Sequence, residues 1–79
     1  MHTFHIIMGS KPFTDLVPLG ESEDFPPDIH FSTDYFRRTG KILIEIPVYY
    51  LPKVPEPFIL SSAVAAAHEY IRTHPEEFP

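Results

Sequence analysis

The sequence predicts an α+β fold, in which one C-terminal helix packs on one face of a small antiparallel sheet. The sheet has three strands, or four if residues 13–17 add an extended piece. Two stretches, residues 2–8 and 28–51, alternate between apolar and polar side chains, as half-buried strands do. Residues 61–73 are rich in alanine, which favours a helix. Most of the ten prolines lie between these stretches and separate them.

Length and composition predict a single domain with a thin core. A chain of 79 residues buries only about 60% of its unfolded surface. Its 43% of hydrophobic residues is nevertheless too high for a disordered chain. The sequence has no cysteine, which fits a reducing compartment and excludes disulfides and thiolate metal sites. It has neither a secretory signal pattern nor an apolar run of membrane-spanning length, so we expect a cytoplasmic protein that does not enter a membrane.

The first strand is expected at residues 2–8 and is followed by a long proline-rich loop over residues 9–27. This loop holds four prolines and two glycines, and proline is excluded from long helices and central strands. A structureless loop of this length is unusual inside a compact domain. We therefore expect either a short extended piece around residues 13–17 or a loop with a function.

Residues 28–51 predict a β-hairpin that turns at residues 39–40. The register that pairs Tyr35 with Ile44 gives one almost wholly apolar face and one mixed face, and a slip of one residue destroys this agreement. Pro47 cannot donate a ladder hydrogen bond, so the strand should be an edge or carry a bulge at that point. The helix should cover the face that holds Ile42, Ile44, Ile46 and Val48.

The C-terminal part of the chain predicts an extended connection, a helix and a loose end. Residues 52–59 carry three prolines and should run extended. The helix should span residues 61–73, with Ser61 or Ser62 as its N-cap. Residues 75–79 should fray. The packing face of the helix is expected to hold Val64, Ala67, His68 and Ile71, flanked by Ala63, Ala66 and Tyr70.

The sheet face away from the helix is the leading candidate for function. Phe36, Leu43 and Tyr49 should lie on it, and aromatic residues beside scattered charges are typical of a protein interface. The leading hypothesis is therefore a small non-enzymatic protein-binding module, such as an adaptor, a subunit or an inhibitor. Two alternatives for this face are that the loop over residues 9–27 folds across it, or that it pairs with itself in a homodimer.

Three cations, Arg37, Arg38 and Lys41, are expected at the tip of the hairpin. They could join the protein interface, or contact phosphates while the neighbouring aromatic residues stack on a base. Nucleic-acid binding is therefore the second hypothesis. The formal net charge of −5 argues against non-specific binding along nucleic acid, and a solvated turn explains the cations as well.

The acidic stretch in the long loop, which includes Glu21, Glu23 and Asp24, would meet a basic partner if it has a function. The ordinary reading of such a stretch is a solvated loop.

No catalytic, metal-binding or cofactor-binding motif stands out. The five histidines lack the spacing of metal ligands, so we expect no metal and no cofactor. In the predicted register Asp34 and Glu45 lie opposite each other, and such a pair could serve as acid and base beside a histidine. A small enzyme built on this pair is the third hypothesis, but an open sheet face lacks the concave pocket that such chemistry needs.

Overall fold

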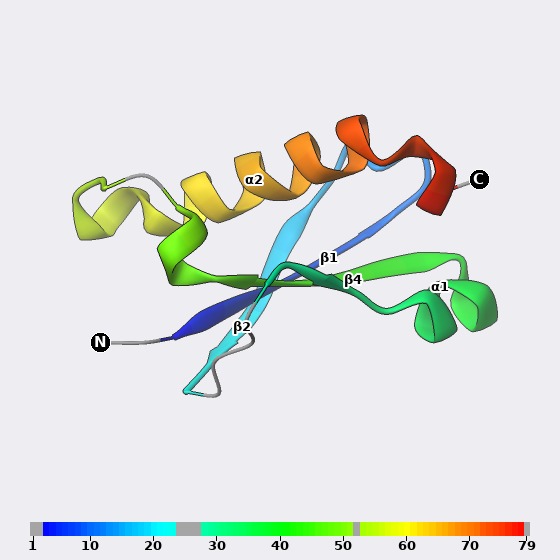
Figure 1. Ribbon diagram of the computed structural model, residues 1–79, viewed down its shortest axis with the longest axis horizontal. Helices are drawn as coiled ribbons and strands as arrows, with labels where there is room; N and C mark the ends of the chain where they lie inside the picture. The colour runs from blue at the N-terminus through cyan, green and yellow to red at the C-terminus, as the bar shows by residue number, and fades with distance from the viewer. Residues whose placement is uncertain (1–2, 24–27, 52, 79) are drawn as a thin grey trace.

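The computed structural model describes residues 3–23, 28–51 and 53–78. Four strands form one antiparallel sheet in the spatial order β2-β1-β4-β3. They are β1 (Phe4–Ser10), β2 (Val17–Ser22), β3 (His30–Phe31) and β4 (Lys41–Pro47). Helix α2 (Ile59–Thr73) lies along one face, whereas helix α1 (Thr33–Thr39) sits at the end of the sheet where β4 begins (Figure 1). The predicted α+β class with a C-terminal helix is confirmed, and the sheet has four strands, but the additional strand is β2 at Val17–Ser22 and not the extended piece expected at residues 13–17.

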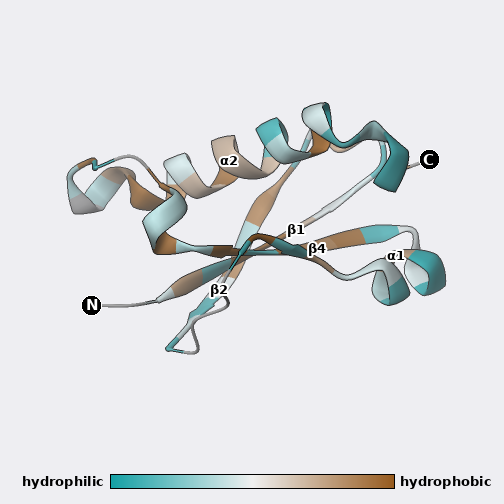
Figure 2. Ribbon diagram, viewed as in Figure 1, coloured by the Kyte–Doolittle hydropathy of each residue, from teal (hydrophilic) through white to brown (hydrophobic). Residues whose placement is uncertain are grey.

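The core lies between α2 and the two central strands. In the register of β1 and β4, Ile7 pairs with Ile44, and both side chains are fully buried. From α2, the small side chains of Ala63 and Ala67 let the helix backbone approach the sheet closely. Figure 2 shows hydrophobic residues along β4 and along parts of α2. The predicted apolar face of β4 is thus confirmed in Ile42, Ile44 and Ile46.

Among the described residues, five aromatic rings close the core at one end of the molecule, and we call them the aromatic cluster. The ring centroids of Phe31 and Phe78 are 4.3 Å apart, and Phe13 lies 5.8 Å from Phe78. The other members, Phe36 and Tyr70, lie 6.2 and 6.1 Å from Phe78. Only 9% of Phe78 is exposed, so the prediction of a frayed tail is wrong for residues 75–78, and residue 79 lies outside the described residues. The short turn η3 (Pro75–Glu77) brings Phe78 back under α2.

The predicted hairpin over residues 28–51 is correct in its antiparallel pairing but wrong in its extent and its turn. β3 has only two residues, and Phe31 pairs with Ile44 in place of Tyr35. Helix α1 replaces the turn. The hydroxyl oxygen of Ser32 accepts a hydrogen bond from the Tyr35 amide at 3.3 Å, and Gly40, with φ of 74°, ends the helix.

Among the described residues, no strand pairs with β4 at Pro47 on one side, which suits the missing N–H of proline. The next residue, Val48, donates its amide to the Thr3 carbonyl next to β1 at 3.0 Å. Successive amides of a strand point in opposite directions, so the nitrogen of Pro47 faces the side of β3. The pairing of β3 with β4 reaches only Glu45. The expected edge at Pro47 is confirmed, although β4 is otherwise a central strand.

Two more boundaries differ from the predictions. β1 runs from Phe4 to Ser10, two residues beyond the expected end, and residue 2 of the predicted strand lies outside the described residues. β2 occupies residues 17–22 of the predicted loop, and a bulge opposite Ile6 and Ile7 accommodates its irregular pairing.

Helix α2 also begins earlier than predicted. Its first residue is Ile59, and its N-cap, Phe58, makes no side-chain capping bond, so the expected serine caps are wrong. The predicted end at Thr73 is confirmed. His68 is exposed and does not pack on the sheet as expected.

Candidate functional site

The sheet face turned away from α2 carries a row of apolar side chains across three strands. Leu43 on β4 pairs with Met8 on β1, which in turn pairs with Val17 on β2. Leu43 and Met8 are half-buried, and Val17 is 52% exposed. Tyr35, which belongs to α1, donates a hydrogen bond from its hydroxyl to the sulfur of Met8, and the two atoms are 3.7 Å apart. We call this surface, with the neighbouring Ile6, Lys41 and Glu45, the open sheet face.

Two of the three apolar residues expected on this face lie elsewhere. Phe36 belongs to the aromatic cluster, with its ring centroid 5.7 Å from that of Phe31. Tyr49 is 51% exposed, but it lies in the short turn η1 (Val48–Tyr50), where it stacks on Tyr50 at 5.0 Å. Leu43 alone of the three is on the open sheet face.

The predicted cations are split between α1 and the open sheet face. Arg37 and Arg38 are exposed in the last turn of α1, and Arg38 pairs with Asp34 at 3.6 Å. Lys41 is the first residue of β4, and because it is two residues from Leu43 its side chain points to the same face of the sheet. The aromatic neighbours of these cations contact the sheet and the aromatic cluster, so the expected combination of a basic tip with aromatic stacking platforms does not form.

The predicted pair of carboxylates does not form. Asp34 is on α1, whereas Glu45 is on β4 and its carboxylate oxygen lies 3.2 Å from the Nδ1 atom of His30. The register of β3 and β4 places His30, not Asp34, opposite Glu45. Within residues 3–23, 28–51 and 53–78, no three histidine or acidic side chains are gathered so that they could hold a metal ion. In the same residues, no helix combines the length and the apolar character that crossing a membrane requires.

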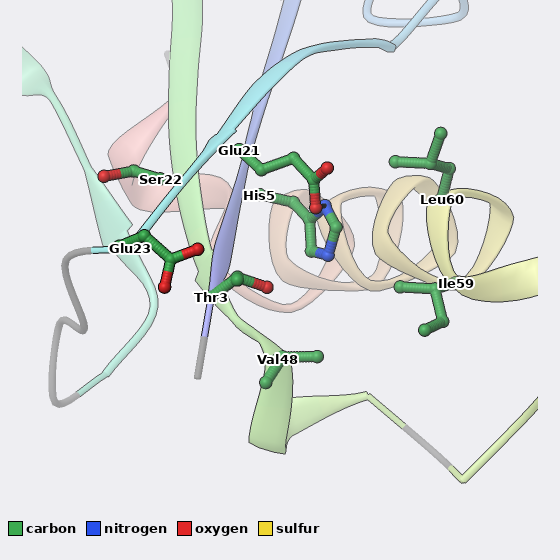
Figure 3. A pocket seen from close by; sticks show the side chains of 8 residues that line it. All are labelled: Thr3, His5, Glu21, Ser22, Glu23, Val48, Ile59 and Leu60. Atoms are coloured by element: carbon green, nitrogen blue, oxygen red, sulfur yellow. Dashed lines mark ion pairs between the residues drawn. The ribbon is translucent and has the colours of Figure 1, made fainter. Parts of the chain in front are cut away.

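A cavity of about 590 Å³ lies between the edge of the sheet and the start of α2 (Figure 3). We call it the His5 pocket. Sequence reasoning identified two of its acids, Glu21 and Glu23, but missed His5, because β2 was predicted as part of a loop. The pocket is lined by Thr3 and His5 near the start of β1, Glu21, Ser22 and Glu23 at the end of β2, Val48 of η1, and Ile59 and Leu60 of α2.

His5 is the polar side chain most deeply set in this pocket. The register of β1 and β2 pairs it with Glu21, and only 3% of its side chain is exposed. Its buried Nδ1 atom has no hydrogen-bond partner among the described residues. The nearest carboxylate oxygen, Oε2 of Glu21, is 3.8 Å away, which is beyond hydrogen-bonding distance. Figure 3 shows the ring of His5 facing the carboxylate of Glu21. The third predicted acid, Asp24, lies outside the described residues.

A second hollow, of about 490 Å³, lies on the other flank of α2 and contains two perturbed tyrosines. The hydroxyl of Tyr50 donates a hydrogen bond to the carboxylate of Asp28, which raises the pKa of Tyr50 to about 12. Burial, and then the hydrogen bond to Glu77 at 3.0 Å, raise the pKa of Tyr70 to about 12. Both donors are already paired within the chain, so this hollow offers a ligand less unmet bonding capacity than the His5 pocket.

Comparisons with protein-family models, with curated proteins and with solved structures found no match for this chain. A proposal for its function therefore has to start from the geometry of the open sheet face and of the His5 pocket.

Proposed function

We propose that this protein is a small non-enzymatic protein-binding module that acts through its open sheet face. The observation that carries the proposal is the row of Leu43, Met8 and Val17 across three strands. Because side chains alternate along a strand, this row lies on the face opposite the core residues that pack against α2. These apolar side chains are in contact with water, and burying them against another apolar surface would be favourable. Contiguous apolar surface on a small domain is typical of a site that another protein occupies.

The charges that flank the row favour a second copy of this chain as the occupant. Every second side chain of β4 points to the open sheet face, and these include Lys41, Leu43 and Glu45. Leu43 therefore has a cation on one side and an anion on the other. In a two-fold dimer each contact occurs twice with the partners exchanged. A two-fold axis near Leu43 would place each Lys41 against Glu45 of the other copy.

The test measures the mass of the protein by light scattering on a sizing column over a range of concentrations. The wild type is expected to run as a dimer at high concentration and to dissociate on dilution. Leu43→Asp and Val17→Asp each place a charge in the apolar row and should give monomers. Tyr49→Asp makes the same kind of change at an exposed side chain outside the open sheet face and should leave the dimer intact.

Charge exchange tests the geometry of the dimer. Lys41→Glu and Glu45→Lys should each weaken it, because each places like charges together, and the double variant should restore it. Circular dichroism melts show whether each variant is folded. If Leu43→Asp unfolds the monomer, the face is part of the core and the proposal fails.

A wild type that is monomeric at every concentration would contradict the second copy as occupant and leave a foreign protein as the partner. Capture from a lysate, with Leu43→Asp as the control, would then test the binding module itself.

The other hypotheses have less support. Nucleic-acid binding through Arg37, Arg38 and Lys41 would need aromatic side chains free to stack on bases, but Tyr35 and Phe36 contact the sheet and the aromatic cluster. If this hypothesis were correct, binding to nucleic acid would weaken steeply as the salt concentration rises. The enzyme hypothesis loses the pair of Asp34 and Glu45. A cytoplasmic location, suggested by the absence of cysteine, stays a prediction.

A further inference from the structure

The His5 pocket combines two carboxylates, one imidazole and an apolar wall. Glu21 and Glu23 are both exposed at its rim, and among the described residues that line it there is no lysine or arginine. Ile59 and Leu60 form part of its wall from the first turn of α2. The pocket lies away from the row of apolar side chains on the open sheet face, because His5 points to the same side of the sheet as the buried Ile7.

His5 supplies a second and independent indication that something binds here. Buried polar atoms are nearly always hydrogen-bonded, and an unpaired one lowers stability. The Nδ1 atom of His5 is buried without a partner among the described residues, although Glu21 stands directly across the strand pair. In a sequence selected for stability alone, this nitrogen would be expected to have a hydrogen-bond partner within the chain.

The distance between the two groups fits a nitrogen donor placed between them. Nδ1 of His5 and Oε2 of Glu21 are 3.8 Å apart, too far for a direct hydrogen bond. One nitrogen that carries two hydrogens can reach both acceptors at about 2.9 Å each. Glu21 is 61% exposed, so its carboxylate has room to move aside as such a group enters. In this arrangement Nδ1 is the unprotonated acceptor of a neutral imidazole.

Charge decides between a cationic and an anionic ligand. The start of α2 at Ile59 contributes a fractional positive charge of about one half, which would favour an anion. The carboxylates of Glu21 and Glu23 contribute two full negative charges at the same pocket. The net field therefore favours a cation, and the apolar wall favours one that is attached to an aliphatic stem.

We infer that the His5 pocket binds an alkyl guanidinium or alkyl ammonium group, whose nitrogen bridges His5 and Glu21 while its stem lies against Ile59 and Leu60. The chemistry is that of an arginine or lysine side chain in a peptide, or of a free polyamine. The site is independent of the open sheet face, and the whole chain can bind such a group whether or not it forms a dimer.

The test titrates the full chain with a blocked tripeptide, acetyl-Ala-Arg-Ala-amide, and follows the ring nitrogens of His5 by nitrogen-15 NMR. Binding should shift the Nδ1 resonance of His5 and should be saturable. The same peptide with citrulline in place of arginine keeps the shape but loses the charge, and should bind about tenfold more weakly or not at all. Titration with spermidine distinguishes the two sources, since the tighter ligand identifies which of them the site prefers.

Three variants locate the binding. Glu21→Gln keeps the size of the side chain and should weaken binding about tenfold, because it removes a charge-assisted hydrogen bond. His5→Phe should also weaken binding and should remove the NMR response. Glu76→Gln makes the same charge change in η3, which is remote from the pocket, and should leave the affinity unchanged.

Three results would overturn the inference. One is a failure of both the peptide and spermidine to move the His5 resonance at millimolar concentration. The others are equal binding of the citrulline peptide, and unchanged affinity in a folded Glu21→Gln variant.

Discussion

Tyr50 and Asp28 show how one hydrogen bond shifts the titration of both partners. The phenol of Tyr50 donates to the carboxylate of Asp28. Ionisation of Tyr50 would remove the donated proton and place a second negative charge beside Asp28, so the pKa of Tyr50 rises to about 12. The same bond stabilises the charged carboxylate and lowers the pKa of Asp28.

Asp28→Asn should therefore bring the pKa of Tyr50 back toward 10, its ordinary value. Glu77→Gln is the matched variant, because it removes the corresponding acceptor of Tyr70 and should lower the pKa of that residue instead. Both changes can be followed by the ultraviolet absorbance of tyrosinate in an alkaline titration. An unshifted Tyr50 in Asp28→Asn would show that the bond does not persist in solution.

The sign of the effect on stability follows from the direction of the shifts. The pKa values of Tyr50 and Tyr70 are higher in the folded chain than the ordinary value of 10. Their contribution to stability is complete below pH 10 or so and is lost as the pH rises through about 12. Urea melts at rising alkaline pH should show this loss, and it should be smaller in Tyr70→Phe.

Single residues were predictable from the sequence where alternation decided their environment. Ile42, Ile44 and Ile46 all point to the core, because residues two apart in a strand share one face of the sheet. Phe36 was misplaced because its direction depends on α1, which the alternating pattern did not reveal. His5 was missed because its environment depends on Glu21, and their pairing requires the register of a strand that had been predicted as loop.

At the level of elements, α1 is the instructive error. Its sequence, TDYFRRT, has few strong helix formers, so the flanking alternation favoured a strand. Its ends nevertheless carried helix signals, namely Ser32 as N-cap and Gly40 after the last turn. The observed register differs from the predicted one by four positions, an even number, so Phe31 still faces the side of Ile44. The facing of side chains was therefore predicted more reliably than their partners.

Gly40 should tolerate a side chain poorly because it ends α1 in the left-handed region, with φ of 74°. Gly40→Ala is expected to lower the free energy of unfolding by about 1 kcal/mol. Gly20→Ala on β2 is the control, because among the described residues no atom beyond its chain neighbours lies within 4 Å of the added carbon, and it should change stability by less than about 0.5 kcal/mol. Urea denaturation of the two variants gives the comparison, and equal stability would contradict the C-cap of α1.

At the level of the whole molecule, the aromatic cluster joins segments that are distant in sequence. Phe13 enters it from the β1–β2 connection, Phe36 from α1, and Phe78 from the C-terminal tail. The cluster could not be predicted because Phe13, Phe36 and Phe78 lie in segments that were expected to be loop, strand and loose end. Composition gave only the number of aromatic residues, and the packing of the helices decided where they meet.

Phe78→Ala is expected to lower the free energy of unfolding by about 3 kcal/mol, because it empties the centre of the aromatic cluster. Phe58→Ala removes the same atoms from a side chain that is 57% exposed and should cost less than about 1 kcal/mol. Chemical denaturation followed by circular dichroism measures both. Similar losses in the two variants would mean that the tail does not pack as described.

The pairing of β1 with β4 also has a kinetic consequence. Its nearest partners, Ser10 and Lys41, are 31 positions apart along the chain, and its remaining partners are further apart still. The helices can form from residues that are close in sequence. The centre of the sheet forms only when this long loop closes, and the chain loses the loop-closure entropy before the contacts of the core stabilise it. We therefore expect the chain to fold on the order of milliseconds, not microseconds. During that search β1 exposes alternating apolar residues, and a nascent chain is most vulnerable to misassociation in this interval.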